Sequence, residues 1–165
     1  MGTLTVTIRI DGVRETLAAF RRLDKGASAV LRKRTLELSE TLADRVRAAG
    51  AADTRQTALV APTVRARRDR VPAIAAGGGK KVGSKKARAG DLLYGTEFGM
   101  NRRTGWYALS RFRGSKARQF RPHRGRASYW FFKTVEENAP EISAAWRAVA
   151  DDVLKDWSSG GPAGG

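Results

Sequence analysis

The sequence has 165 residues, of which 41% are hydrophobic, and it carries a formal net charge of +16. This length and apolar content suffice for one domain with a packed core, so wholesale disorder is not expected. The chain has no cysteine and one histidine, His123. These counts exclude disulfide frameworks, thiol catalysis and cysteine-ligated zinc, and they argue against a histidine-based metal site.

The N-terminal stretch MGTLTVTIRI alternates like a strand and lacks the basic and apolar regions of a secretory signal. No apolar run approaches the roughly 18 residues that a membrane span requires. We therefore expect a soluble protein that stays inside the cell that makes it, or is built into a particle there.

The positive charge is concentrated in the middle of the chain. Between Arg65 and Arg126 there are 18 Lys and Arg residues against three acidic residues, so +15 of the net +16 lies in this region. Such asymmetry indicates a surface that faces a polyanion or an acidic protein. The alternative is a set of solvated loops in a basic, arginine-rich protein.

The first third of the chain predicts one strand and two helices. Apolar residues at period two predict a half-buried strand over 4–10, and helical spacing predicts a short helix from Val13 to a break at 24–26. A long amphipathic helix should follow, capped by Ser28 and ended by Gly50. Its apolar face is formed by Leu31, Thr35, Leu38, Leu42, Val46 and Ala49.

The next third predicts strands and loops. Residues 58–67 and 71–75 have the pattern of a β-hairpin around a turn at 68–70. Residues 76–90 are rich in Gly and Lys, which predicts a flexible basic loop. The stretch DLLYGTEFG, residues 91–99, is apolar and aromatic and predicts another strand.

The last third predicts a second basic loop and a terminal helix. Residues 100–127 form the basic loop, and the aromatic run SYWFF begins at Ser128. The sequence Asn138-Ala139-Pro140-Glu141 has the spacing of a helix start. A stripe of apolar residues then continues to Trp157, and 158–165 is expected to be a disordered tail.

Together these elements predict an α+β fold in a single domain spanning residues 1–157, with a small antiparallel sheet packed on the long helix and on the C-terminal helix. The residues expected in the core are Leu31, Leu38, Leu42, Val46, Leu93, Phe98, Trp146, Val149 and Val153.

Catalytic signals are weak. The stretch GGGKKVGSK resembles a phosphate-binding loop, but Gly83 is followed by Ser84-Lys85, the reverse of the required order, without a preceding apolar strand. The basic middle has only three carboxylates, and His123 is expected to be a loop residue. We therefore expect no catalytic residues, no metal site and no cofactor.

Arginines mixed with aromatic residues are the strongest indication of a binding function. Guanidinium groups contact phosphate, and aromatic rings stack on bases. Alternatively, the aromatic residues anchor a long loop while the arginines meet water or an acidic partner. The residues expected to contact a partner or DNA are Arg102, Arg103, Arg111, Arg113, Arg118, Arg121, Arg124 and Arg126. Those expected at a subunit interface are Glu97, Trp106, Tyr107, Phe112 and Phe120.

The order of these motifs resembles the tail-completion and head–tail joining proteins of long-tailed phages, the lambda Z-like neck family. A Gly-Val start to a short helix at Gly12 precedes the long helix and a variable hairpin. The family's strand, roughly Tyr-Ala-x-x-x-Glu-Phe-Gly-Thr, is matched by Tyr94, Glu97, Phe98 and Gly99, although Met100 replaces the Thr. Residues 129–132 take the place of the family's Pro-Phe-Leu lead-in to the last helix. The Pro-x-x-Thr-Gly usual after the long helix appears only as residues 51–55.

The resemblance implies a structural protein of the virion, assembled in the host cytoplasm into a ring of identical subunits, expected to be a hexamer. Such a ring completes the tail and joins it to the head around the DNA path, against adjacent neck and tail rings. Within it, Glu97 is expected at the rim of the sheet, paired with an arginine of its own or the next subunit.

The alternative function is a free nucleic-acid-binding protein. No RRM, KH, zinc-finger or helix-turn-helix signature is present, and the arginine–aromatic mixture is the feature that favours it.

Overall fold

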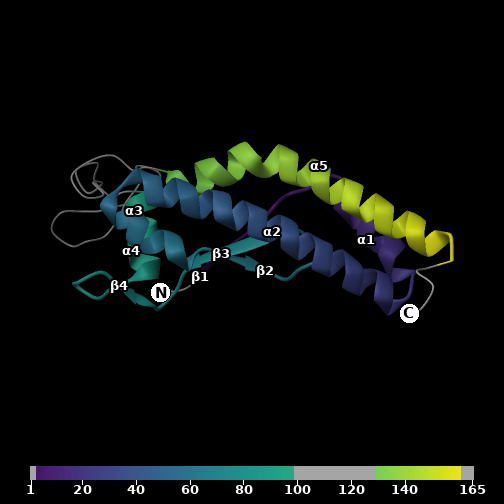
Figure 1. Ribbon diagram of the computed structural model, residues 1–165, viewed down its shortest axis with the longest axis horizontal. Helices are drawn as coiled ribbons and strands as arrows, with labels where there is room; N and C mark the ends of the chain where they lie inside the picture. The colour runs from purple at the N-terminus through teal and green to yellow at the C-terminus, as the bar shows by residue number, and fades with distance from the viewer. Residues whose placement is uncertain (1–2, 99–128, 161–165) are drawn as a thin grey trace, which may run out of the picture.

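The computed structural model describes residues 3–98 and 129–160, and residues 1–2, 99–128 and 161–165 lie outside this description. Its largest feature is a pair of antiparallel helices, α2 (Lys25–Asp53) and α5 (Trp130–Ser158), each of 29 residues. At 1.5 Å per residue each helix is roughly 44 Å long, so the pair sets the long axis of the molecule (Figure 1).

A three-stranded antiparallel sheet lies against α2. Its strand order is β1 (Thr3–Thr7), β3 (Ala73–Gly77) and β2 (Arg65–Arg67). The central strand, β3, is therefore the last of the three along the chain. Every residue of β3 is buried, and its sequence AIAAG offers small side chains that let a helix approach closely. The Ser39 hydroxyl of α2 accepts a hydrogen bond of 3.1 Å from the backbone N–H of Ala73, which fixes the start of the strand on the helix.

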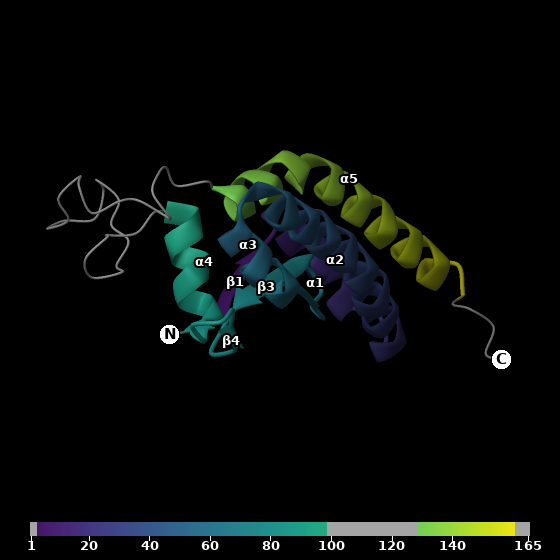
Figure 2. The same cartoon turned by 60° about the vertical axis from the view of Figure 1, so that its left-hand side comes forward.

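The remaining elements cover the two ends of this core. Helix α1 (Val13–Arg21) packs near the start of α2 and the end of α5. At the other end lie α3 (Arg55–Val60), the 3₁₀ turn η1 (Ala61–Thr63), a short hairpin of β4 (Lys81–Val82) and β5 (Ala87–Arg88), and α4 (Ala89–Phe98). Figure 2 shows α4 beside α3, next to the start of α5.

The predicted α+β class is confirmed, as are the long helix on the sheet and the strand near the N-terminus. Of the nine residues expected in the core, Leu31, Leu42, Val46, Leu93, Trp146 and Val153 are buried. Leu38 and Val149 are partly buried against that core. Phe98 is the last residue of α4, and its side chain lies outside the description.

The predicted ends of the long helix are wrong. The helix begins at Lys25, and the carboxylate of Asp24, not Ser28, accepts the capping hydrogen bond from the N–H of Ala27 at 3.1 Å. It also continues through Gly50 to Asp53. Gly50 is buried inside the helix, and the reason for a glycine there is packing against Trp130 rather than helix termination.

The predicted strand over 91–99 is also wrong, since residues 89–98 form α4. The buried residues Ala89, Leu93, Thr96 and Glu97 recur at helical spacing. Two of them are polar, so a hydrophobic pattern does not reveal the stripe. Gly77, at φ +82°, lets β3 approach the start of this helix, because a Cβ there would lie 3.0 Å from Cα of Gly90.

The segments on either side of the sheet differ from expectation as well. Only 65–67 of the expected strand over 58–67 is a strand, and α3 and η1 occupy the residues before it. The expected pairing with the following strand does occur, with Ala66 opposite Ile74. Residues 76–90, expected as a flexible loop, contain the end of β3, the β4–β5 hairpin and the first residues of α4.

The start of the last helix is nine residues earlier than the cap-like sequence predicts, since the N-cap is Tyr129 and not Asn138. Helix α5 begins at Trp130, and Pro140 lies inside it on the exposed side. The helix also extends to Ser158, within the expected tail, and residues 161–165 lie outside the description.

Candidate functional site: the junction of α4 and α5

The strongly basic segment 99–128 connects α4 to Tyr129, the residue immediately before α5, and lies outside the described residues. The backbone N–H of Tyr129 donates a hydrogen bond of 3.3 Å to the carbonyl of Glu97. The described residues on either side of the segment therefore lie next to each other. We call the group formed by Thr96, Glu97, Trp130, Phe131 and Phe132 the junction.

Glu97 joins the two helices through its side chain. One carboxylate oxygen accepts the backbone N–H of Phe131 at 2.9 Å, and the other accepts that of Phe132 at 3.0 Å. These N–H groups belong to the first turn of α5, where no partner within the helix exists. The residue that precedes the helix, Tyr129, has φ 53° and supplies no side-chain cap. Glu97 thus caps α5 from 34 residues away in the sequence.

The Glu97 carboxylate is held in an environment that opposes its charge. The residue is only 1% exposed, and burial raises its pKa to about 7. The two N–H donors of α5 act in the opposite direction, while the negative charges of Asp53 and Glu136 add to the upward shift. The junction therefore contains a buried acid that titrates near neutral pH.

Trp130 fills the space between α4, α5 and the end of α2. Its indole Nε1 donates to the hydroxyl of Thr96 at 3.0 Å, and that hydroxyl donates to the carbonyl of Leu93 at 3.0 Å. The ring lies against the backbone of α2, where a Cβ at Gly50 would be 2.6 Å from its nearest carbon. Phe131 meets the Trp130 ring edge-on, with ring centres 5.7 Å apart.

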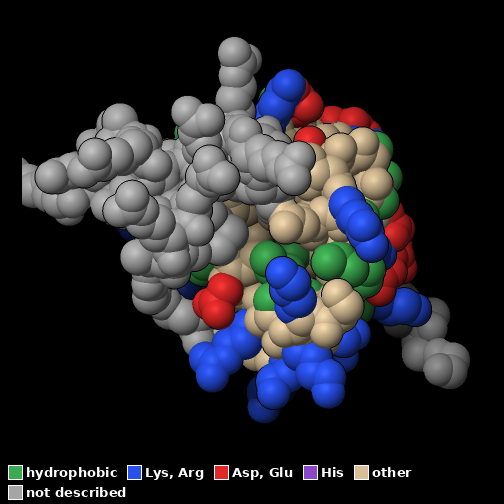
Figure 3. Space-filling model, turned by 90° about the vertical axis from the view of Figure 1, so that its left-hand side faces the viewer, with side chains coloured by type: hydrophobic (Ala, Val, Ile, Leu, Met, Phe, Trp, Pro, Cys, Tyr) green, Lys and Arg blue, Asp and Glu red, His purple; other side chains and the backbone are tan. Residues whose placement is uncertain are grey.

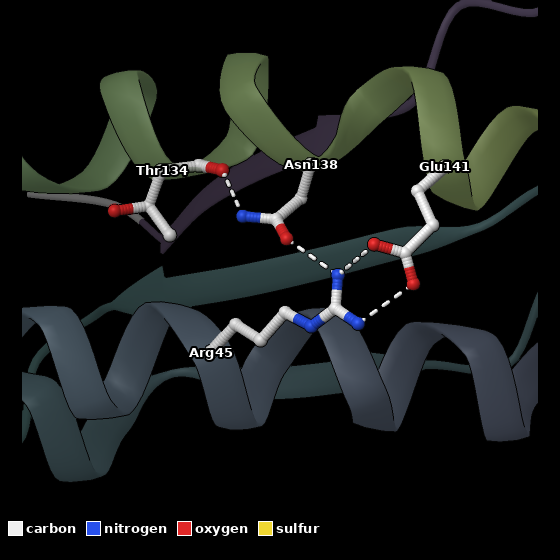
Figure 4. Close-up of polar contacts among 4 residues, drawn as sticks. All are labelled: Arg45, Thr134, Asn138 and Glu141. Carbon is white, nitrogen blue, oxygen red and sulfur yellow. Dashed lines mark hydrogen bonds and ion pairs between the residues drawn. The ribbon is translucent and has the colours of Figure 1, made fainter.

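A second polar contact fixes α5 on α2 further along. Figure 4 shows the Arg45 guanidinium between Asn138 and Glu141. It donates to the Asn138 side-chain oxygen at 2.5 Å and to both carboxylate oxygens of Glu141 at 2.7 and 2.8 Å. The Asn138 amide donates in turn to the carbonyl of Thr134 at 2.7 Å. This exposed clamp lies beside Pro140, which has no N–H to donate within the helix.

The β4–β5 hairpin adds exposed positive charge at the opposite end of α4. It is held to that helix by hydrogen bonds from Ala89 to the Lys80 carbonyl and from Gly90 to the Gly78 carbonyl, of 2.7 and 2.9 Å. Figure 3 shows Lys and Arg side chains gathered along the lower edge of this end of the molecule. The exposed basic residues in and next to the hairpin are Lys80, Lys81, Lys85, Lys86 and Arg88.

Most residues expected to make contacts lie outside the described part of the chain. This applies to all eight arginines from Arg102 to Arg126 and to Trp106, Tyr107, Phe112 and Phe120. Glu97 is described, and its expected position at the rim of the sheet is wrong, since it lies buried in α4 and both its oxygens accept N–H groups of α5. Its expected place at a subunit interface stays a prediction.

Thr96, Trp130 and Gly50 were not predicted to belong to a site. A glycine near the end of the long amphipathic helix was the one available signal for close packing there, and it was interpreted as a helix end.

Comparisons of the chain with models of protein families, with curated proteins and with solved structures found no match. Within residues 3–98 and 129–160, no helix is both long and apolar enough to cross a bilayer. The same residues contain no group of three or more His, Cys, Asp or Glu side chains arranged to hold a metal ion.

Proposed function

We propose that this protein is a structural subunit of a phage virion, located at the neck or tail end. In this proposal identical subunits form a closed ring, expected to be a hexamer, that completes the tail and joins it to the head around the DNA path. The order of sequence motifs that resembles the lambda Z-like neck family supports this proposal. Residues 94–98, which match the family's strand in sequence, belong to helix α4 here. The resemblance therefore supports the proposal through the sequence match alone.

The observation that carries the proposal is the separation of charge along the chain. Segment 99–128 contains eight arginines and Lys116 and no acidic residue. All sixteen acidic residues lie in the described part, and ten of them are on α2 and α5. A segment with nine uncompensated positive charges is stabilised by an acidic surface or a polyanion.

The junction supports the assignment of that segment to intermolecular contact. It joins the described residues on either side of the segment through hydrogen bonds of Glu97 and Trp130. Contact between the basic segment of one subunit and the acidic helices of the next would join two different surfaces. Repetition of such a heterologous contact generates a ring when the rotation closes.

The direct test is the mass of the assembled particle. Native mass spectrometry and negative-stain electron microscopy of the purified chain should show closed rings at high concentration and low salt, with dissociation as salt is raised. Micrographs of an infected-cell lysate that lacks the gene would separate the two roles. Full heads beside complete tails would indicate head–tail joining, and overlong or unfinished tails would indicate control of the tail end.

The second candidate is a free nucleic-acid-binding protein, which the mixture of arginine and aromatic residues over 102–126 favours. A filter-binding titration against salt separates the two functions. Micromolar or tighter binding of duplex DNA by the monomer, with a steep dependence on salt, would favour free binding over a ring.

A further inference from the structure

A positively charged cavity lies at the end of the molecule opposite the junction, where α1 meets the start of α2. Its volume is about 440 Å³, and the buried ring of Phe20 forms part of its lining. Four basic side chains from three parts of the chain surround it. They are Arg21 at the end of α1, Lys25 and Arg32 on the first turns of α2, and Arg68 in the turn after β2.

These four side chains have no counterion in the structure. None of them forms an ion pair or a side-chain hydrogen bond with any residue of the described ranges. No unseen side chain supplies an acid either, because every Asp and Glu of the sequence lies within those ranges.

The one acid in the lining, Asp24, is already engaged. The same carboxylate oxygen accepts the N–H of Ala27 at 3.1 Å and the indole N–H of Trp157 at 3.0 Å. It therefore caps α2 and ties it to α5, and its single negative charge leaves the four cations of the lining in excess. Because Asp24 caps the N-terminus of α2, that terminus is not open to an anion. The site is therefore defined by the basic side chains.

The backbone elements that carry the basic residues are held by contacts within the protein. A Cβ at Gly26 would lie 2.9 Å from the Asp24 carboxylate and 3.2 Å from the Trp157 ring, so the first turn of α2 is closely packed. The turn that carries Arg68 is held by a hydrogen bond of 2.8 Å from Trp146 Nε1 to the carbonyl of Arg70. The four basic residues, which are exposed, are thus carried by anchored backbone elements, which lowers the cost of ordering them around an anion.

We infer that this cavity binds phosphate groups of a nucleic-acid backbone. Three guanidinium groups and an ammonium group offer more donors than one carboxylate can accept, whereas a phosphodiester and its neighbours offer several oxygens. The Ser28 hydroxyl in the lining adds a neutral donor. The residues that line this site do not belong to segment 99–128. The inference therefore does not depend on whether the protein forms a ring or acts as a monomer.

The test is a nuclear magnetic resonance titration of the full-length ¹⁵N-labelled chain. Pyrophosphate and a short DNA duplex should both shift the backbone resonances of Ser28 and Ala29 and the indole resonance of Trp157, with saturation. Absence of these shifts would overturn the inference. Equal or stronger shifts with poly-glutamate at the same charge concentration would also overturn it, by assigning the cavity to an acidic protein.

Matched variants separate this site from general electrostatics. The triple variant Arg21→Gln, Arg32→Gln, Arg68→Gln should weaken pyrophosphate binding roughly tenfold or more. It should also lower the salt slope of duplex binding by about 1 or more.

The control triple Arg9→Gln, Arg55→Gln, Arg65→Gln removes the same charge from exposed positions outside the cavity. It should leave both quantities nearly unchanged, and equal losses in the two triples would refute the site. Ring formation is measured by particle mass, so failure here is distinguishable from failure of the proposed assembly.

Discussion

Helix α5 is held in place by different interactions in the middle of the α2–α5 pair and at the junction. In the middle, apolar residues such as Leu42, Val46 and Trp146 pack together, and the only ion pairs are exposed. At the junction, a buried carboxylate and a buried hydroxyl accept hydrogen bonds from α5. An apolar interface loses stability in proportion to the atoms removed, whereas a buried polar contact leaves an unsatisfied partner when it is broken.

The largest effect is expected at Glu97. The change Glu97→Ala leaves two N–H groups in the first turn of α5 without acceptors in a buried site. We expect the free energy of unfolding to fall by about 3 kcal/mol, measured by urea denaturation near pH 6. The exposed control Glu40→Ala should leave the urea midpoint nearly unchanged. A loss below about 1 kcal/mol at Glu97 would show that the cap is not required.

The pH dependence of stability should report the same carboxyl group. Its pKa in the folded protein is raised to about 7 from an ordinary value of 4.5, so the fold prefers the protonated form. This contribution is fully present below about pH 4.5 and is lost as the pH rises through 7. The difference corresponds to about 3 kcal/mol. Urea denaturation between pH 5 and 8 should show a decline in the wild type that is much smaller in Glu97→Gln, and equal slopes would contradict the assignment.

Because Trp130 packs against α2 at Gly50, a side chain at position 50 should destabilise the fold. The change Gly50→Ala raises helix propensity, yet its Cβ would lie 2.6 Å from the indole ring and 3.0 Å from the Cβ of Ala61. We expect a net loss of about 2 kcal/mol, measured by thermal denaturation. In a Trp130→Leu background the same change should cost less, because the ring is gone. An equal cost in both backgrounds would place the clash elsewhere.

The smallest effect is expected for the exposed clamp. Replacement of Arg45 by methionine removes its hydrogen bonds to Asn138 and Glu141 but keeps the apolar part of the side chain on the helix. Exposed ion pairs contribute little, so the melting temperature should fall less than in Gly50→Ala. A double-mutant cycle with Glu141→Gln measures the coupling, and a loss as large as that of Glu97→Ala would reverse the ranking.

The sequence predicted the parts of the fold whose signals are local. The period-two strand, predicted over 4–10 and observed over 3–7, and the stripe from Leu31 to Val46 depend on neighbouring residues alone. Both elements were recognised. The start of α5 was placed near Asn138 because the true cap, Glu97, is remote in the sequence and no local residue replaces it. Helix α4 was read as a strand because Thr96 and Glu97 are polar on its buried side.

The candidate site was predictable only in part. Glu97 was singled out from the sequence, but its expected partner was an arginine rather than the N-terminus of α5. The basic cavity at Arg21, Arg32 and Arg68 was not predicted, because its residues are spread over 47 positions and meet only after α1, α2 and the sheet have packed.

The central claim is that the junction holds out the basic segment for contact with other subunits, and one replacement tests it directly. The residues that flank the segment are joined by the hydrogen bond between Tyr129 and Glu97, so a short Gly-Ser linker in place of 100–127 can close the gap. We expect this variant to keep a cooperative melting transition near that of the wild type, and its mass by native mass spectrometry to fall from a ring to a single subunit. A linker variant that still forms a ring of the same subunit number, or a wild-type chain that stays monomeric at every concentration, would contradict the account.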